Sequence, residues 1–275
     1  MPSGTSPTEN PVTAPHRPRK RFSQNFLVDR HYIGRIVDAI APQPGQTLVE
    51  IGPGQGALTA PLIERAGRVI ALEIDRDLAA ALRERWPAEQ LELHVGDALE
   101  ADLGALGPAL RVVGNLPYHI SSPLLFHCAR HRRAIRDLHF MLQEEVVDRI
   151  VAAPDTGAYG RLSVMLQAQF AAAKLFRVPA GAFHPVPAVE SAIVRLAPLG
   201  AAAPSVEDEV LFEAIVAAGF GQRRKTLRNA LQRLVPAAML EALGIDPGRR
   251  AETLAVADFA AIANAAHAAR KAASA

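Results

Sequence analysis

A glycine-rich turn and a later acidic residue give this chain its first chemical signal. Gly52, Gly54 and Gly56 follow the short apolar run at residues 48–51. Glycine reaches positive φ angles without strain, and because it has no Cβ, a ligand can lie against its main chain. Glu73 ends the next apolar run, VIALE, where a carboxylate can accept hydrogen bonds from both hydroxyls of a ribose. The turn and the acid together predict a cofactor that contains a nucleoside.

The turn alone leaves the identity of that cofactor open. Gly52, Gly54 and Ala57 also satisfy the relaxed G-x-G-x-x-A form of the dinucleotide fingerprint. A nicotinamide or flavin cofactor is therefore an alternative, and so is a tight strand-to-helix turn that binds nothing. The choice depends on residues further along the chain.

Two more polar residues follow later apolar runs. Asp97 comes after LELHV, where it can accept a hydrogen bond from the amino group of adenine or simply cap a turn. Asn115 begins the tetrapeptide N-L-P-Y, which is the most specific signal in the sequence. The Asn115 amide oxygen and the Leu116 carbonyl can accept both hydrogens of one amino group. Pro117 adds no competing N–H and keeps Leu116 extended.

Two aromatic residues are candidates for holding a nucleobase. Tyr118, which ends the tetrapeptide, offers a flat face for stacking. Phe183, in the loop FHPVPAVE, is the candidate for the opposite face, although packing in the core would explain it nearly as well. A base held in this way presents its amine to an incoming methyl group, so the residues favour methyl transfer to an exocyclic nitrogen.

The elements that must position these residues alternate between apolar runs and helical patterns. Strands are expected at residues 47–51, 69–73, 91–95, 111–114 and 137–142, with helices between them, a helix at 159–170, and closing strands KLFRV and SAIVRL. This alternation predicts an α/β domain with a mostly parallel sheet covered on both faces and with ligands beyond the carboxyl ends of its strands. Asp29 is the expected N-cap of an earlier helix.

Composition and charge bound the remaining possibilities. The chain has 275 residues, of which 49% are hydrophobic and 21% charged, enough for one large domain and a small one. Its single cysteine excludes an internal disulfide and fits a reducing compartment. No apolar stretch resembles a membrane span or a signal peptide, so we expect a cytoplasmic location.

We expect three segments. Residues 1–21 form a disordered, basic tail, and residues 22–200 form the α/β domain. The linker LGAAAPS precedes a helical domain at 201–275, with helices near 206–218, 222–234 and 252–269. The net charge is only +2, yet residues 214–240 contain five basic residues and no acid, which suits a polyanion. We predict RNA contacts from Arg223, Arg224, Lys225 and Arg228.

The ordered series of motifs resembles that of the rRNA adenine N6-dimethyltransferases. It comprises FSQNFL at 22–27, EIGPGQG at 50–56, LEID at 72–75, GDA at 96–98, NLPYHISSPLLF at 115–126, FHPVPAVES at 183–191 and FGQRRKTLRNAL at 220–231. The resemblance covers nearly the whole chain after the tail. It implies a class I methyltransferase domain with a Rossmann-like, mostly parallel seven-stranded sheet, followed by a small helical RNA-binding domain.

The resemblance also implies a cofactor, a substrate and site residues. The cofactor is S-adenosylmethionine, and no metal is needed. The substrate is a pair of adjacent adenosines near the 3′ end of 16S rRNA, dimethylated within a 30S subunit or an assembly intermediate, with the enzyme acting as a monomer. The cofactor residues are Asn25, Leu27, Gly52, Glu73, Asp97 and Asn115, with Gly54 of the same loop, and the chemistry is assigned to Asn115, Leu116, Pro117, Tyr118 and Phe183.

Three alternative functions remain at this point. A macrolide-resistance 23S rRNA methyltransferase would share the first domain, but the long basic helical part argues against it. A noncatalytic assembly factor would not need the intact N-L-P-Y, Glu73 and Asp97. An NAD-dependent oxidoreductase is the weakest, because no catalytic histidine or Tyr-Lys pair can be placed.

Overall fold

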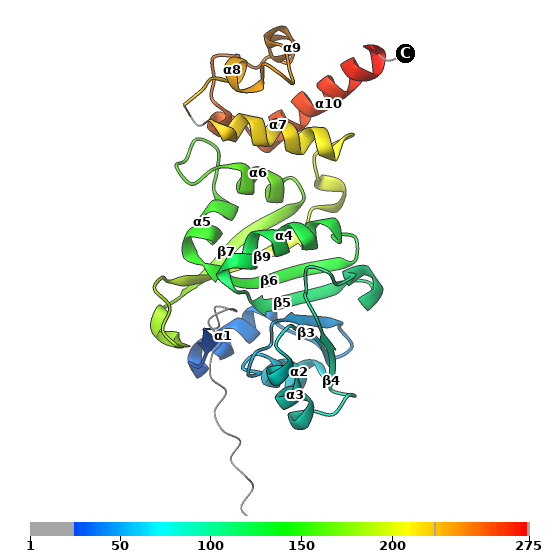
Figure 1. Cartoon of the computed structure of the whole chain (residues 1–275), viewed down its shortest axis with the longest axis vertical. Coiled ribbons are helices and arrows are strands. Elements are labelled where there is room, and N and C mark those ends of the chain that lie inside the picture. Colours follow the sequence, from blue (N-terminus) through cyan, green and yellow to red (C-terminus); the bar gives the residue numbers. More distant parts are fainter. Residues whose placement is uncertain (1–24, 223, 274–275) are drawn as a thin grey trace, which may run out of the picture.

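A sheet with helices on both faces and a group of C-terminal helices lie along the long axis of the molecule (Figure 1). The computed structural model describes residues 25–222 and 224–273. The predictions for the N-terminal tail and for Arg223 lie outside the described residues. Within those ranges, no helix combines the length and the apolar character that crossing a membrane requires.

The sheet has, in the described part of the chain, seven strands in the order β4-β3-β2-β5-β6-β9-β7. Neighbouring strands from β4 to β6 are parallel, whereas β9 runs antiparallel to both β6 and β7. This confirms the predicted mostly parallel sheet, and the five predicted parallel strands are all present. The strands are β2 (Leu48–Ile51), β3 (Val69–Glu73), β4 (Leu91–Val95), β5 (Leu110–Asn115), β6 (Ile135–Gln143), β7 (Phe170–Val178) and β9 (Ser191–Pro198).

Helices cover both faces of the sheet. One buried cluster joins the sheet to α4, α5 and α6, and another joins it to α1, α2 and α3. The Asp29 carboxylate accepts hydrogen bonds from the main-chain N–H groups of His31 (2.8 Å) and Tyr32 (3.4 Å), which confirms it as the N-cap of α1. The helices are α1 (Arg30–Ile40), α2 (Thr59–Ala66), α3 (Arg76–Arg85), α4 (Ser121–Arg130), α5 (Glu144–Val151) and α6 (Arg161–Gln167).

A two-stranded ribbon joins the N-terminal segment to a loop far along the chain. Strand β1 (Phe26–Leu27) pairs antiparallel with β8 (Phe183–His184). The main-chain N–H groups of Val28 and Asp29 then donate to the Ala182 carbonyl at 2.9 and 3.2 Å. The ribbon has no counterpart among the sequence-based predictions, because each strand is only two residues long.

The C-terminal helices differ in part from the prediction. The expected helix at 222–234 is wrong in extent, because among the described residues of that range only those of α8 (Leu227–Leu231) are helical. The first N–H groups of α8 donate to carbonyls of the 247–249 turn, which fixes where the helix starts. The other helices are α7 (Glu209–Gly221), α9 (Ala237–Ala242), which was not expected, and α10 (Val256–Ala273).

The C-terminal helices share a buried core with the first part of the chain. Val164 and Met165 of α6 belong to the same apolar cluster as residues of α7 and α10. The described strands end at Pro198, and the segment that follows is helical. A division into two domains near residue 200 stays a prediction.

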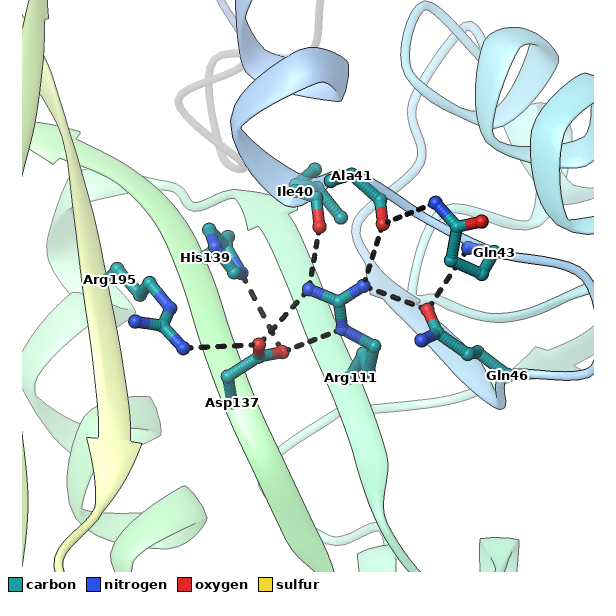
Figure 2. Close-up of polar contacts among 8 residues, drawn as sticks. All are labelled: Ile40, Ala41, Gln43, Gln46, Arg111, Asp137, His139 and Arg195. Carbon is teal, nitrogen blue, oxygen red and sulfur yellow. Dashed lines mark hydrogen bonds and ion pairs between the residues drawn. The ribbon is translucent and has the colours of Figure 1, made fainter.

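A buried ion pair lies toward the starts of β5 and β6, away from the strand ends that carry Asn115 (Figure 2). The guanidinium of Arg111, a residue only 6% exposed, donates to both carboxylate oxygens of Asp137 at 2.9 and 3.0 Å. It also donates to the carbonyls of Ile40 (2.6 Å) and Ala41 (3.2 Å) at the end of α1, and to the Gln46 side chain (2.8 Å). One side chain thus joins two strands to the carbonyl end of a helix.

His139 lies beside this ion pair, two residues after Asp137 on β6. Neither of its ring nitrogens has a hydrogen-bond partner among the described residues. Burial lowers the pKa of His139 to about 4, the nearby carboxylate opposing this only in part. The imidazole is therefore neutral at physiological pH.

Candidate cofactor and target-base site

A cavity of about 290 Å³ opens at the carboxyl ends of β2, β3, β4 and β5. Parallel strands end together at this edge, which is where open α/β sheets bind their ligands. All seven residues predicted to contact the cofactor, Asn115 among them, line the cavity, together with the other three residues of N-L-P-Y. They are Asn25, Leu27, Gly52, Gly54, Glu73, Asp97, Asn115, Leu116, Pro117 and Tyr118.

Glu73 holds the glycine turn in place. One carboxylate oxygen accepts the N–H of Gly54 at 3.1 Å, and the other accepts the N–H of Asp75 at 2.8 Å. Burial raises the pKa of Glu73, and these N–H donors oppose the rise. Each carboxylate oxygen has a second lone pair, so the group can still accept from a ribose diol. Gly54 itself has a φ of 59°, in the left-handed region where glycine is favoured.

Asp97 has a structural role as well as a position on the cavity wall. Its carboxylate accepts the N–H of Leu99 at 2.9 Å, which is the turn role considered in the sequence. The side chain is half-buried and lines the cavity. A carboxylate has two oxygens, so capping the turn leaves an acceptor for an adenine amino group.

Glu50 is a cavity residue that the sequence-based reasoning missed. It lies on β2, is 2% exposed, and accepts a hydrogen bond from the Thr59 hydroxyl at 2.6 Å. Burial raises its pKa to about 7, with a smaller contribution from the charge of Glu73. The sequence did contain a signal that could have identified Glu50, namely an acid inside an otherwise apolar strand. Carboxylates are seldom fully buried without a role, so such an acid is a candidate site residue.

The charges of the cavity select the class of ligand. The acidic residues that line it are Glu50, Glu73 and Asp97, and its described lining contains no lysine or arginine. Such a lining favours a ligand that carries positive charge. It fits a nucleoside that carries positive charge.

Asn115 has a fixed orientation at the end of β5. Its side-chain Nδ2 donates to the main-chain carbonyl of Asn25 at 3.0 Å. Because a carbonyl can only accept, this bond determines which way the amide lies and leaves Oδ1 as the acceptor that is not used by Asn25. The residue is half-buried and lines the cavity.

Gly114 allows β5 to pass close to β2 just before Asn115. A Cβ added at Gly114 would lie 2.6 Å from the carbonyl oxygen of Ile51, closer than carbon and oxygen atoms pack. No larger residue fits without moving a strand that carries the site. The sequence alone did not single out Gly114, because its close approach to Ile51 arises only when β5 pairs with β2.

The two aromatic candidates have different surroundings. Tyr118 is half-buried, lines the cavity, and its hydroxyl lies 3.2 Å from the Ser191 hydroxyl. Phe183 does not line the cavity. It is 2% exposed and packs in the apolar core behind the β1–β8 ribbon. Its position is therefore that of a core residue, and stacking on a base would require the ribbon to rearrange.

The predicted RNA residues that the structure describes lie apart from this cavity. Arg224, Lys225 and Arg228 are exposed around the start of α8, and none of them lines the cavity. A second, more open cavity of about 1,070 Å³ extends from Gln143 at the end of β6 to Phe220 in the last turn of α7. In residues 25–222 and 224–273, His, Cys, Asp and Glu side chains form no cluster able to hold a metal ion.

The chain matches one protein family along almost its whole length. Residues 15–268 match the family described as ribosomal RNA adenine dimethylase. "Ribosomal RNA small subunit methyltransferase A" from Aromatoleum aromaticum is 59% identical over 249 residues, which cover 90% of this chain and 94% of that protein. The protein of the same name from Chromobacterium violaceum is 51% identical and covers 92% and 97%.

Two solved structures have the same fold over most of the chain. A dimethyladenosine transferase from Plasmodium falciparum matches with a TM-score of 0.75 and 26% identity, over 86% of this chain and 95% of that one. The 23S rRNA methyltransferase ErmE matches with a TM-score of 0.66 and 30% identity, over 88% of this chain and 100% of that one.

Proposed function

Because the chain belongs to the ribosomal RNA adenine dimethylase family, we propose that it dimethylates N6 of two adjacent adenosines near the 3′ end of 16S rRNA. The methyl donor is S-adenosylmethionine. Relatives at 51 to 59% identity are named small-subunit methyltransferases, which supports the small subunit over the 23S alternative. We place the substrate in a 30S subunit or its assembly intermediate, and the enzyme in the cytoplasm as a monomer.

One hydrogen bond supports the proposed chemistry more than any other observation. The bond from Asn115 Nδ2 to the Asn25 carbonyl leaves Oδ1 to accept from the adenine amine. The Leu116 carbonyl is the proposed second acceptor. Two acceptors hold both amine hydrogens and orient the nitrogen lone pair, which is otherwise shared with the purine ring. Alignment of this kind supplies up to about 7 to 11 kcal/mol of barrier reduction in favourable cases.

The remaining cavity residues position the two reactants. When bound, S-adenosylmethionine supplies a methyl group activated by the positive sulfonium. Glu73 and Asp97 are proposed to hold its ribose and adenine, and the negative cavity suits its positive charge. Tyr118 is proposed to stack on the target base. The amine nitrogen would form its bond to the methyl carbon as the bond from that carbon to the sulfonium sulfur breaks, with neutral S-adenosylhomocysteine as the leaving group. The nitrogen, cationic after transfer, would then lose its proton to water, so no strong base is needed.

Cofactor affinity is expected to depend on the protonation of Glu50. Folding raises the pKa of this carboxyl from 4.5 to about 7, so the unliganded protein loses stability as the pH rises through this range. A cationic cofactor favours the ionised carboxylate. Its affinity should therefore fall below about pH 7, by up to about tenfold per pH unit.

Calorimetric titration with S-adenosylmethionine between pH 6 and 8 checks this expectation. Glu50→Gln should bind more weakly at pH 8 and show a shallower pH dependence than the parent protein. Glu73, whose pKa is also raised, remains in the variant and accounts for the residual slope. Equal slopes in the two proteins would exclude Glu50 as the titrating group.

The exposed basic residues near α8 are proposed to bind RNA phosphates. Arg224→Glu with Lys225→Glu should weaken RNA binding and reduce the slope of log K against log salt by about 0.7 to 0.9 for each phosphate that the variant no longer neutralises. Filter binding at several salt concentrations measures this slope. Arg65→Glu with Arg68→Glu changes the same charge at exposed positions of α2 and the loop before β3, and should leave the slope unchanged.

Tritiated methyl transfer tests the function itself. Small subunits that lack the modification, free 23S rRNA and free 16S rRNA are each incubated with the full chain and labelled S-adenosylmethionine, and the nucleosides are then analysed. Labelled N6,N6-dimethyladenosine in the small subunit alone is the expected result. Transfer to 23S rRNA alone would establish the macrolide-resistance activity, and cofactor binding without transfer to any RNA would indicate a noncatalytic assembly factor.

A further inference from the structure

The hydroxyl of Ser191 meets the hydroxyl of Tyr118 at the wall of the cavity, 3.2 Å away. We infer that Ser191 is a positioning residue for methyl transfer, which fixes where the Tyr118 ring lies against the target base. This inference rests on the proposed function. Ser191 does not line the cavity, so its effect reaches the base through Tyr118.

The scaffold holds Ser191 from both sides. It is the first residue of β9, where it pairs with Gln143 of β6 on one side and Val178 of β7 on the other. Only 1% of the residue is exposed. Its main chain is therefore fixed within the sheet, and the hydroxyl is a rigid point to which another side chain can bind.

Tyr118 has much less support of its own. It begins a short 3₁₀ helix, Tyr118–Ile120, directly after Pro117, and its ring is half-buried at the cavity. The Cα of Tyr118 holds one end of the ring, whereas the phenol oxygen lies at the opposite end. Binding that oxygen to Ser191 fixes the long axis of the ring at both ends, so the ring no longer swings away by rotation about the Cα–Cβ bond.

The position of the ring matters for the reaction because stacking requires the base to lie over its face. Aromatic stacking on a base is sequence-tolerant and requires only that the two faces meet. The amine must at the same time reach the Asn115 oxygen, whose direction is set by Asn25. A ring free to swing about the Cα–Cβ bond would let the base leave this alignment, and the rate of transfer would fall without a change in cofactor binding.

A double-mutant cycle tests the inference in the full chain. Ser191→Ala and Tyr118→Phe each remove the same hydrogen bond, so each should lower kcat on unmodified small subunits by about 2- to 12-fold, the range for a neutral hydrogen bond. The affinity for S-adenosylmethionine should stay unchanged in both. The double variant should be no slower than the slower single variant, because the bond is already absent from each of them.

A second buried serine provides the matched control. Ser163 is fully buried, and its hydroxyl donates to the Arg149 carbonyl, away from Tyr118. Ser163→Ala should lower the thermal unfolding midpoint, and any change in kcat should multiply with that of Tyr118→Phe. If Ser191→Ala fails to fold, Ser191→Thr, which keeps the hydroxyl, should retain the parental kcat while Tyr118→Phe is slower by about 2- to 12-fold.

The outcomes separate this inference from the proposed function. Rate reductions that multiply in the double variant of Ser191 and Tyr118, or single variants with parental kcat, would overturn the positioning role while the parent protein still methylates small subunits. A parent protein that methylates no RNA would overturn the proposed function, and the inference would fall with it.

Discussion

Asn115→Ala is expected to lower the rate of methyl transfer by about 10²- to 10³-fold, the loss typical of removing one preorganised hydrogen-bonding group from a reaction site. The variant loses the acceptor at Oδ1 and also the bond to the Asn25 carbonyl. Single-turnover transfer of labelled methyl groups to unmodified small subunits measures the rate. RNA affinity should change by less than about twofold, because the predicted phosphate contacts lie elsewhere.

Asn115→Asp tests the orientation of the acceptor oxygen separately from its presence. The aspartate keeps an acceptor oxygen, but it places a second oxygen where Nδ2 now lies 3.0 Å from the Asn25 carbonyl. Two acceptors repel at that distance, so the side chain should rotate and the variant should also be slow. Rapid transfer by the alanine variant, above about a tenth of the parental rate, would remove Asn115 from the mechanism.

Arg111→Met is expected to reduce the free energy of unfolding by about 3 to 5 kcal/mol, because it leaves the Asp137 carboxylate buried without its partner. Asp137 is 3% exposed, and the same substitution also removes the donors for the last carbonyls of α1 (Figure 2). Urea unfolding followed by circular dichroism measures the loss.

Two further variants make this expectation specific to the unpaired charge. Arg111→Met with Asp137→Leu should be more stable than Arg111→Met alone, because no carboxylate is then buried unpaired. Arg195→Met removes a guanidinium that lies 3.8 Å from Asp137 on a side chain that is 49% exposed, and should cost less than about 1 kcal/mol. A double variant less stable than the single one would show that the stability comes from the contacts with α1.

The parallel strands and the cofactor edge could be predicted because each depends on local pattern. An apolar run that ends in glycine or an acid defines both a strand and the polar residue at its end, as with Glu73 and Asp97. Parallel topology then brings the strand ends together without further information. For the same reason, Gly52, Glu73, Asp97 and Asn115 line one cavity, whereas Asn25 and Leu27, which also line it, were expected only from the family resemblance.

Features that depend on partners distant in the sequence could not be predicted from local pattern. The β1–β8 ribbon joins two dipeptides, and it places Phe183 in the core where a stacking role had been expected. Glu50 is the one acid in the otherwise apolar strand β2, and its contact with Thr59 forms only when β2 and α2 pack together. The start of α8 is set by carbonyls some twenty residues later.

The β1–β8 ribbon also sets the earliest time at which a newly made molecule can complete its cofactor site. Asn25 meets Asn115 from a segment held by Phe183 and His184, which leave the ribosome long after residues 26 and 27. At about 5 to 20 residues per second this delay lasts on the order of 10 to 30 s. Until residue 184 has emerged, the segment that carries Asn25 is not held against Asn115, so a nascent chain cannot yet form the complete site.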